Sequence, residues 1–239
     1  MSSEAGLFAL IGAGPSLDYC DTEISDLLRR GAHFFISDSI ASGFLRRWRP
    51  RRASVFTVEN RRHMYIHRIS GEVDFSVLAY QGANARNLRF TKARVVSQFK
   101  ITGESGELPM LHSPGTVFGV MLSCAATVNV SSDSREIHLL GADLSYIDNQ
   151  VYCRYIDDHT PPGNRLLTRE LWQFEIMLKK SSVVHLRAGY AIRTGFELAQ
   201  SRENLCQFVK SAPKSTRFIE YSPLGLETPD VERRFPARS

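Results

Sequence analysis

The stretch from Leu7 to Asp18 brings together residue types that can bind an anion. Five apolar residues lead directly into the run Gly12-Ala13-Gly14-Pro15-Ser16. Glycines allow the backbone to turn sharply and to approach a ligand closely. Amide N–H groups in such a turn, together with a serine hydroxyl, can hold a phosphate or a carboxylate. We therefore predict a binding pocket lined by Gly12, Gly14, Pro15 and Ser16, and we expect Gly14→Val to abolish binding without disturbing the fold.

This loop lacks one mark of a dinucleotide site. The fingerprint of such sites needs a third glycine where Leu17 stands, so an ordinary NAD site is disfavoured. A plain tight turn remains an alternative interpretation of the two glycines.

A second set of reactive side chains lies in the segment 145–164, which follows a predicted strand. It contains Tyr146, Tyr152, Tyr155 and His159. Long loops of this kind are often functional, so we predict that it forms a lid over the pocket. A phenolic hydroxyl can donate a hydrogen bond to a phosphate, and an imidazole can act as a base near neutral pH. A histidine in a solvent-exposed loop is the simpler interpretation of His159.

Further polar residues follow other predicted strands or begin a predicted helix. In a parallel sheet, ligands bind beyond the carboxyl ends of the strands, so these residues are expected near the glycine loop. The candidates are Asp38, Asn60, Asn84, Ser113, Gly115, Thr116 and Asp143. The segment Gly115-Thr116 precedes a helix and could form a second anion site.

The elements that must position these residues follow from the hydrophobic pattern. Short apolar runs predict strands at 7–11, 32–37, 53–58, 75–80, 93–99, 136–140 and 183–186. Helices are expected at 22–30, 40–48, 116–130 and 166–180. The alternation indicates an α/β fold, a Rossmann-like mostly parallel sheet with helices on both faces. We predict one domain over 1–212, including the lid, and an irregular C-terminal tail over 213–239, where four of the ten prolines fall.

Composition limits the classes of partner. No apolar run is long enough to span a bilayer, and four widely spaced cysteines favour reduced thiols in a cytoplasmic protein. Only six of the thirty basic residues are lysines, which favours an anionic ligand but is explained equally well by codon usage. The basic run Arg46–Arg52 could contact a membrane surface, although such a run is more often a solvated helix end. No nucleic-acid module is indicated.

Three short motifs occur in the order and spacing of a known family. They are Gly12-Ala13-Gly14-Pro15-Ser16-Leu17-Asp18, Ser113-Pro114-Gly115-Thr116 and Gly141-Ala142-Asp143-Leu144. On these motifs the chain, over about residues 7 to 195, resembles the bacterial sialyltransferases and the motility-accessory-factor flagellin glycosyltransferases. Relatives of that family include the archaeal hydroxymethylpterin diphosphokinases.

The resemblance implies that a cytidine-monophosphate donor binds at the first loop. Asn60 and Asn84 resemble asparagines that hold the sugar and the nucleotide, whereas Asp38 stands where the family has another asparagine. Tyr146 and Tyr152 keep the separation of two tyrosines that hold the donor phosphate. The family's catalytic histidine falls nearest to Asn164, and His159 lies a few residues earlier.

The resemblance therefore implies transfer of a sialic-acid-type sugar from a nucleotide donor to a hydroxyl acceptor, with no metal and no cofactor besides the donor substrate. A diphosphokinase-like pyrophosphate transfer is the first alternative, although the chain lacks that group's Asp-rich turn and His-rich motif. A nucleotide-binding protein that has lost catalysis is the second alternative. The oligomeric state stays open.

Overall fold

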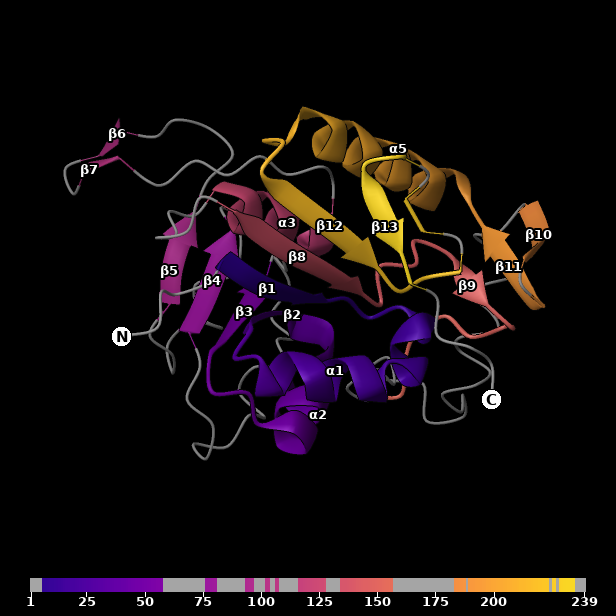
Figure 1. Cartoon of the computed structure of the whole chain (residues 1–239), viewed down its shortest axis with the longest axis horizontal. Helices are drawn as coiled ribbons and strands as arrows, with labels where there is room; N and C mark the ends of the chain where they lie inside the picture. The colour runs from indigo at the N-terminus through magenta and orange to yellow at the C-terminus, as the bar shows by residue number, and fades with distance from the viewer. Residues whose placement is uncertain are drawn as a thin grey trace, which may run out of the picture.

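The protein is built on one large parallel sheet. The computed structural model describes residues 6–57, 76–80, 93–96, 102–103, 106–107, 116–127, 134–156, 183–187, 189–223, 225–226 and 228–234. Eight strands lie in the order β13-β12-β8-β1-β2-β3-β4-β5, and every neighbouring pair is parallel (Figure 1). They are β1 (Gly6–Ile11), β2 (His33–Ser37), β3 (Ala53–Thr57), β4 (Ser76–Tyr80), β5 (Ala93–Val96), β8 (Arg135–Leu140), β12 (Thr216–Glu220) and β13 (Val231–Arg233). The predicted α/β, Rossmann-like class is confirmed.

The central strand β1 is buried along its whole length. Leu7, Ala9 and Ile11 belong to one hydrophobic cluster, whereas Phe8 and Leu10 belong to another. Successive side chains of a strand point to opposite faces, so the two clusters are the layers above and below the sheet. A strand covered on both faces reads as a continuous apolar run, which is why β1 is evident in the sequence.

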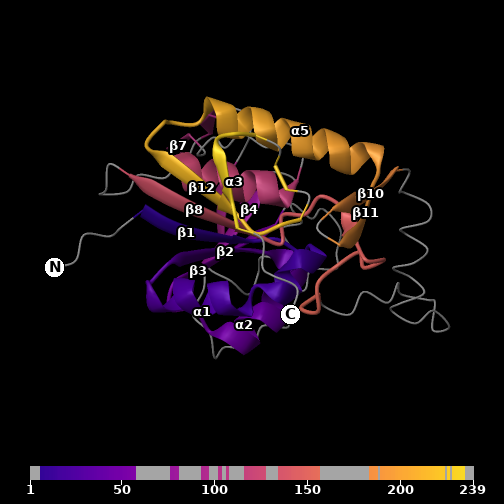
Figure 2. The same ribbon diagram turned by 45° about the vertical axis from the view of Figure 1, so that its right-hand side comes forward.

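Helices cover both faces of the sheet. The helices α1 (Asp21–Arg29) and α2 (Asp38–Trp48) lie on one face, and α3 (Val117–Thr127) and α5 (Phe196–Ser211) lie on the other (Figure 2). The helix α2 ends where Arg49 adopts a left-handed φ of 44° and Pro50 follows. Such a residue followed by proline stops a helix, because proline cannot supply the next N–H group.

Smaller sheets accompany the main one. The strands β9 (Tyr146–Ile147), β11 (Tyr190–Thr194) and β10 (Val183–Arg187) form an antiparallel sheet in the order β10-β11-β9. It joins the segment after β8 to the segment before α5, and Ile147 packs there against Tyr190 and Ile192. Two short strands, β6 (Thr102–Gly103) and β7 (Gly106–Glu107), pair elsewhere.

The segment 213–239, which was predicted to be an irregular tail, contains the strands β12 and β13 of the main sheet. The strand β12 lies between β8 and β13, with Phe218 opposite Ile137 and fully inside the second hydrophobic cluster. Pro213 and Pro223 lie outside this strand rather than in it. The strands β12 and β13 are therefore part of the main sheet.

Two further predictions concern the cysteines and the membrane. Cys20, Cys124, Cys153 and Cys206 are not joined in disulfides in this structure. In the part of the chain that the structure describes, no helix combines the length and apolarity needed to cross a bilayer. The predicted helix at 166–180 lies outside the described residues.

The basic run Arg46–Arg52 lies at the end of α2. Its arginines are exposed, and Trp48 packs against Phe44 and donates a hydrogen bond from Nε1 to the Tyr155 hydroxyl at 3.1 Å. Basic residues at a helix C-terminus also complement the helix dipole. Contact with a membrane through this run stays a prediction.

Candidate functional site

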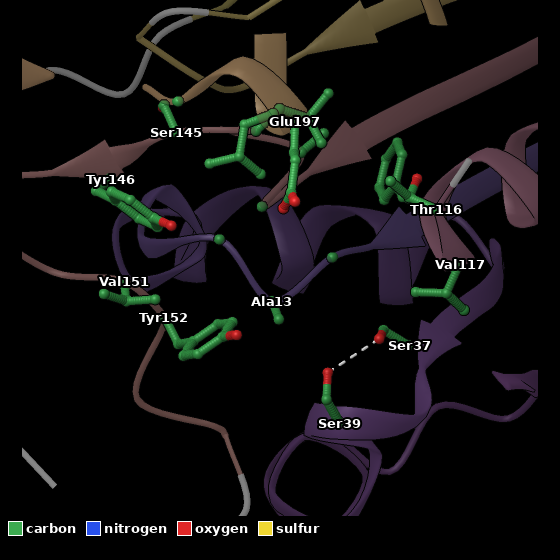
Figure 3. A pocket seen from close by; sticks show the side chains of 18 of the residues that line it. Ala13, Ser37, Ser39, Thr116, Val117, Ser145, Tyr146, Val151, Tyr152 and Glu197 are labelled. Atoms are coloured by element: carbon green, nitrogen blue, oxygen red, sulfur yellow. Dashed lines mark hydrogen bonds between the residues drawn. The ribbon is translucent and has the colours of Figure 1, made fainter. Parts of the chain in front are cut away.

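A cavity of about 700 Å³ opens beyond the carboxyl ends of β1 and β8. From β1 the chain continues to β2 on one side, whereas β8 lies on the other side, so the strand order reverses between these two strands. Ligands of open α/β sheets bind at such a reversal. The walls come from the loops after β1, β2 and β8 and from the starts of α3 and α5 (Figure 3).

The floor of this pocket is a close crossing of two glycine loops. The Gly12 amide donates to the Leu140 carbonyl at 2.8 Å, and the Gly14 amide donates to the Gly141 carbonyl at 3.0 Å. A Cβ atom at Gly12 would overlap the Gly141 carbonyl oxygen and lie 3.1 Å from Phe118 Cδ2. The glycines are therefore required for chain packing as well as for the shape of the pocket.

These contacts correct two expectations about the first loop. The amides of Gly12 and Gly14 are bonded to backbone carbonyls, so they are not available as phosphate donors. A Cβ at Gly14 would lie 2.7 Å from the Gly141 carbonyl oxygen and 2.8 Å from Asp143 Cγ. Gly14→Val would therefore disturb the fold, and loss of binding in that variant would not identify a ligand contact.

Asp143 supports the pocket from below and does not line it. Its side chain is 1% exposed; Oδ2 accepts the Ser16 amide at 2.7 Å, and Oδ1 accepts the Ser222 hydroxyl at 2.6 Å. Burial raises the pKa of Asp143 to about 6, against the lowering effect of these hydrogen bonds. Asp143, Ser16 and Pro15, which were predicted to contact the ligand, do not line this pocket, because all three are buried behind the glycine crossing.

Three helix N-termini face the pocket. The helix α3 begins after Thr116, whose Oγ1 accepts the Gly119 amide at 3.0 Å; α2 begins after Ser37 and α5 after Gly195. All three of these preceding residues line the pocket, and Figure 3 labels Ser37 and Thr116. The first amides of a helix and its dipole favour an anion, so the starts of α2 and α3 give the pocket an anion-attracting end, whereas the first turn of α5 carries the carboxylate of Glu197.

Asp38 does not line the pocket. Its Oδ2 accepts the Thr57 hydroxyl at 2.6 Å, away from the pocket wall. Its neighbours Ser37 and Ser39 line the pocket instead, with their hydroxyls 3.0 Å apart (Figure 3). The first turn of α2 thus directs the Asp38 carboxylate toward β3 and away from the pocket in which a ligand contact was predicted for it.

Tyr146 and Tyr152 both line the pocket (Figure 3). The strand β9 holds Tyr146, which pairs with Arg193 of β11. Burial raises the pKa of Tyr146, and Tyr152 and Glu197 raise it further; burial also raises the pKa of Tyr152. Both phenols therefore keep their proton at neutral pH and can donate hydrogen bonds.

The pocket is rich in hydroxyl groups and poor in charge. Its described hydroxyl side chains are Ser37, Ser39, Thr116, Ser145, Tyr146 and Tyr152. Among the described lining residues, Glu197 alone carries a charge, and neither lysine nor arginine is present. In the described ranges no three His, Cys, Asp or Glu side chains are grouped as metal ligands would be. An anion in this pocket would thus meet helix N-termini and neutral donors.

Several predicted residues cannot be compared with this geometry. His159, Asn60, Asn84, Ser113 and Gly115 lie outside the described residues, and so does the lid after Ile156. Their roles stay predictions.

Sequence reasoning missed the wall contributed by Gly195, Phe196, Glu197 and Leu198. A glycine followed by a long run of good helix formers was a usable signal for the start of α5. That this start faces the glycine loop depends on the antiparallel sheet that β9 and β11 form, which the sequence pattern did not indicate.

Comparison with known proteins adds a likeness of fold. No family model and no curated protein sequence matches the chain. The fold is similar to that of a Maf glycosyltransferase from Magnetospirillum magneticum AMB-1, with a TM-score of 0.62 at 14% sequence identity. The alignment covers 98% of this chain and 34% of that protein, so the chain spans about a third of its length.

Proposed function

We propose that this chain is a glycosyltransferase that binds a nucleotide-activated sugar in the pocket between β1 and β8. The observation that carries the proposal is the convergence of the N-termini of α2 and α3 and several neutral hydroxyl donors on this cavity. The cavity is large enough for a nucleotide-sized ligand. The likeness in fold to a Maf glycosyltransferase supports the same reaction class.

For the donor we propose a cytidine-monophosphate sugar of the sialic-acid type, as the three sequence motifs imply. Such a donor carries a phosphate and a carboxylate, and the anion-attracting end of the pocket suits both. The acceptor supplies a hydroxyl group. The nucleotide sugar is a substrate, and no further cofactor is proposed.

The chemistry that the pocket would assist is the loss of the phosphate leaving group. As the bond from the anomeric carbon to the phosphate breaks, negative charge grows on the phosphate. Hydrogen bonds from Tyr146 and Tyr152 would strengthen as this charge develops. A neutral phenol adds no net charge, so it would hold the released nucleotide less tightly than an arginine would.

The tyrosines provide the first test. We expect Tyr146→Phe and Tyr152→Phe each to lower the turnover of CMP-N-acetylneuraminic acid by roughly tenfold or more, with a smaller effect on the dissociation constant of CMP. Turnover is measured as CMP release, and CMP binding by isothermal titration calorimetry. Tyr19→Phe is the matched control, since Tyr19 is 38% exposed and does not line the pocket.

The outcomes separate the alternatives. If the wild-type protein binds no CMP, the proposed donor is wrong. If it binds CMP and cleaves no donor, the result favours the alternative that the chain is a nucleotide-binding protein without catalytic activity. Equal turnover in the wild type and both pocket variants would remove the tyrosines from the mechanism.

A second test concerns metal dependence. We expect donor cleavage to persist in EDTA, because the proposed phosphate contacts are helix amides and phenols rather than a metal ion. Activity that is lost in EDTA and restored by Mg²⁺, with ATP as a ligand, would instead favour the diphosphokinase alternative. Magnesium can be held by a single carboxylate together with substrate phosphates, and Glu197 would then be the first candidate ligand.

A further inference from the structure

Glu197 brings a carboxylate into a pocket that otherwise suits anions. It lies in the first turn of α5, and its side chain points into the cavity, with Tyr146 and Tyr152 on one side and Thr116 and Val117 on the other (Figure 3). It is the single charged side chain among the described lining residues. A carboxylate in the first turn is favourable for the helix itself, but that role does not require a position inside the cavity.

Glu197 lies on the exposed side of the pocket, whereas the pocket floor is buried. The floor at Gly12 and Gly141 is buried, whereas Glu197 is exposed and the adjacent Phe196 is 81% exposed. Glu197 therefore lies where the pocket opens to solvent and where a second substrate would enter. A carboxylate is repelled by a phosphate, so this residue suits the acceptor rather than the leaving group.

We infer that Glu197 is the general base that activates the acceptor hydroxyl, an inference that rests on the proposed glycosyl transfer. The acceptor oxygen forms a bond to the anomeric carbon and passes its proton to the Glu197 carboxylate. The bond from the anomeric carbon to the donor phosphate oxygen breaks, and the nucleotide leaves with that electron pair. When water is the acceptor, the same step hydrolyses the donor.

The test separates catalysis from binding. With CMP-N-acetylneuraminic acid and water as acceptor, Glu197→Gln is expected to lower turnover roughly a hundredfold, while CMP binds at least as tightly as to the wild type. Glu203→Gln is the matched control on the same helix, where Glu203 is exposed and accepts the Gln207 side-chain amide at 2.7 Å. This variant should keep wild-type turnover.

Azide gives a readout that a purely structural role would not change. Azide is an anionic nucleophile that needs no base, so Glu197→Ala with azide should regain turnover and form the glycosyl azide, detected by mass spectrometry. If Glu197 only stabilises α5, its variants lose stability and azide restores nothing, which overturns the inference.

The remaining outcomes are also decisive. Wild-type turnover in Glu197→Gln overturns the assignment while leaving the proposed function intact; loss of turnover in His159→Ala would then identify the base instead. If the wild-type protein neither binds CMP nor cleaves the donor, the proposed function itself fails.

Discussion

Replacing Glu220 by glutamine is expected to stabilise the protein at pH 8 and to flatten its stability between pH 5 and pH 8. Glu220 lies at the end of β12 with no exposed surface, and its Oε2 accepts the Leu226 amide at 2.7 Å. Burial raises its pKa from 4.5 to about 8, although the Leu226 hydrogen bond and the charge of Arg233 oppose the rise. A glutamine retains an oxygen that can accept the Leu226 amide and has no proton to lose.

The sign follows from proton binding. Between about pH 4.5 and pH 8 the folded state keeps a proton that the unfolded state releases, so the natural chain loses stability as the pH rises through this window. The shift corresponds to a loss on the order of 4 kcal/mol. Asp143, whose pKa is about 6, adds a loss of the same sign at lower pH.

Urea unfolding at pH 5 and pH 8 measures this effect. The wild type should lose more stability than Glu220→Gln between these two pH values, and the difference between their profiles isolates Glu220. Asp143 acts equally in both proteins, and so do His33 and His138, whose pKa values are lowered by burial and which therefore act in the opposite direction. Glu203→Gln, an exposed change of the same type, should leave the wild-type profile unchanged. Identical pH profiles for the wild type and Glu220→Gln would show that Glu220 ionises normally.

The second large effect is expected from Gly12→Ala. The added methyl group would collide with the Gly141 backbone and press on Phe118, and backbone atoms cannot move aside as a flexible side chain can. Overpacking of this kind costs about 1–3 kcal/mol and sometimes more. We expect a lower midpoint of urea unfolding and weaker CMP binding, because the loop crossing forms the pocket floor.

Gly31→Ala is the control for this change. Gly31 has a φ of +74°, but nothing lies within 4 Å of a Cβ built there. Its cost should come from backbone conformation alone, about 1 kcal/mol. If the two variants lose equal stability, close packing at the glycine crossing is not the reason for Gly12.

The interior strands were predictable because a strand buried on both faces appears in the sequence as a short apolar run. Each of β1, β2 and β3 is a short apolar run between turns, and β1 and β3 are buried along their whole length. The apolar pattern of β12 is weaker, because its two apolar residues are flanked by Arg217 and Glu220. It joins the sheet because β8 offers it a free edge, a long-range fact that no local pattern contains.

The glycine loop was also predictable only in part. Its two glycines predicted a tight turn near a ligand, and Gly12 and Gly14 do line the pocket. That their amides bond to Leu140 and Gly141 could not be predicted, since the partners are some 130 residues away. We predicted a ligand contact for Asp143 because the sequence does not show its hydrogen bonds to Ser16 and Ser222, which join three distant segments.

The sequence by itself determined the α/β class, the glycine turn after β1 and the tyrosines that line the pocket, because each depends on residue type and short spacing. Only the tertiary structure decided which polar groups line the cavity and which lie behind its wall. It turned Asp38 and Asp143 inward, where hydroxyl and amide donors satisfy them, and left Ser37 and Glu197 on the pocket wall. Hydrogen-bond partners are set by contacts between remote segments, and a single sequence does not specify those contacts.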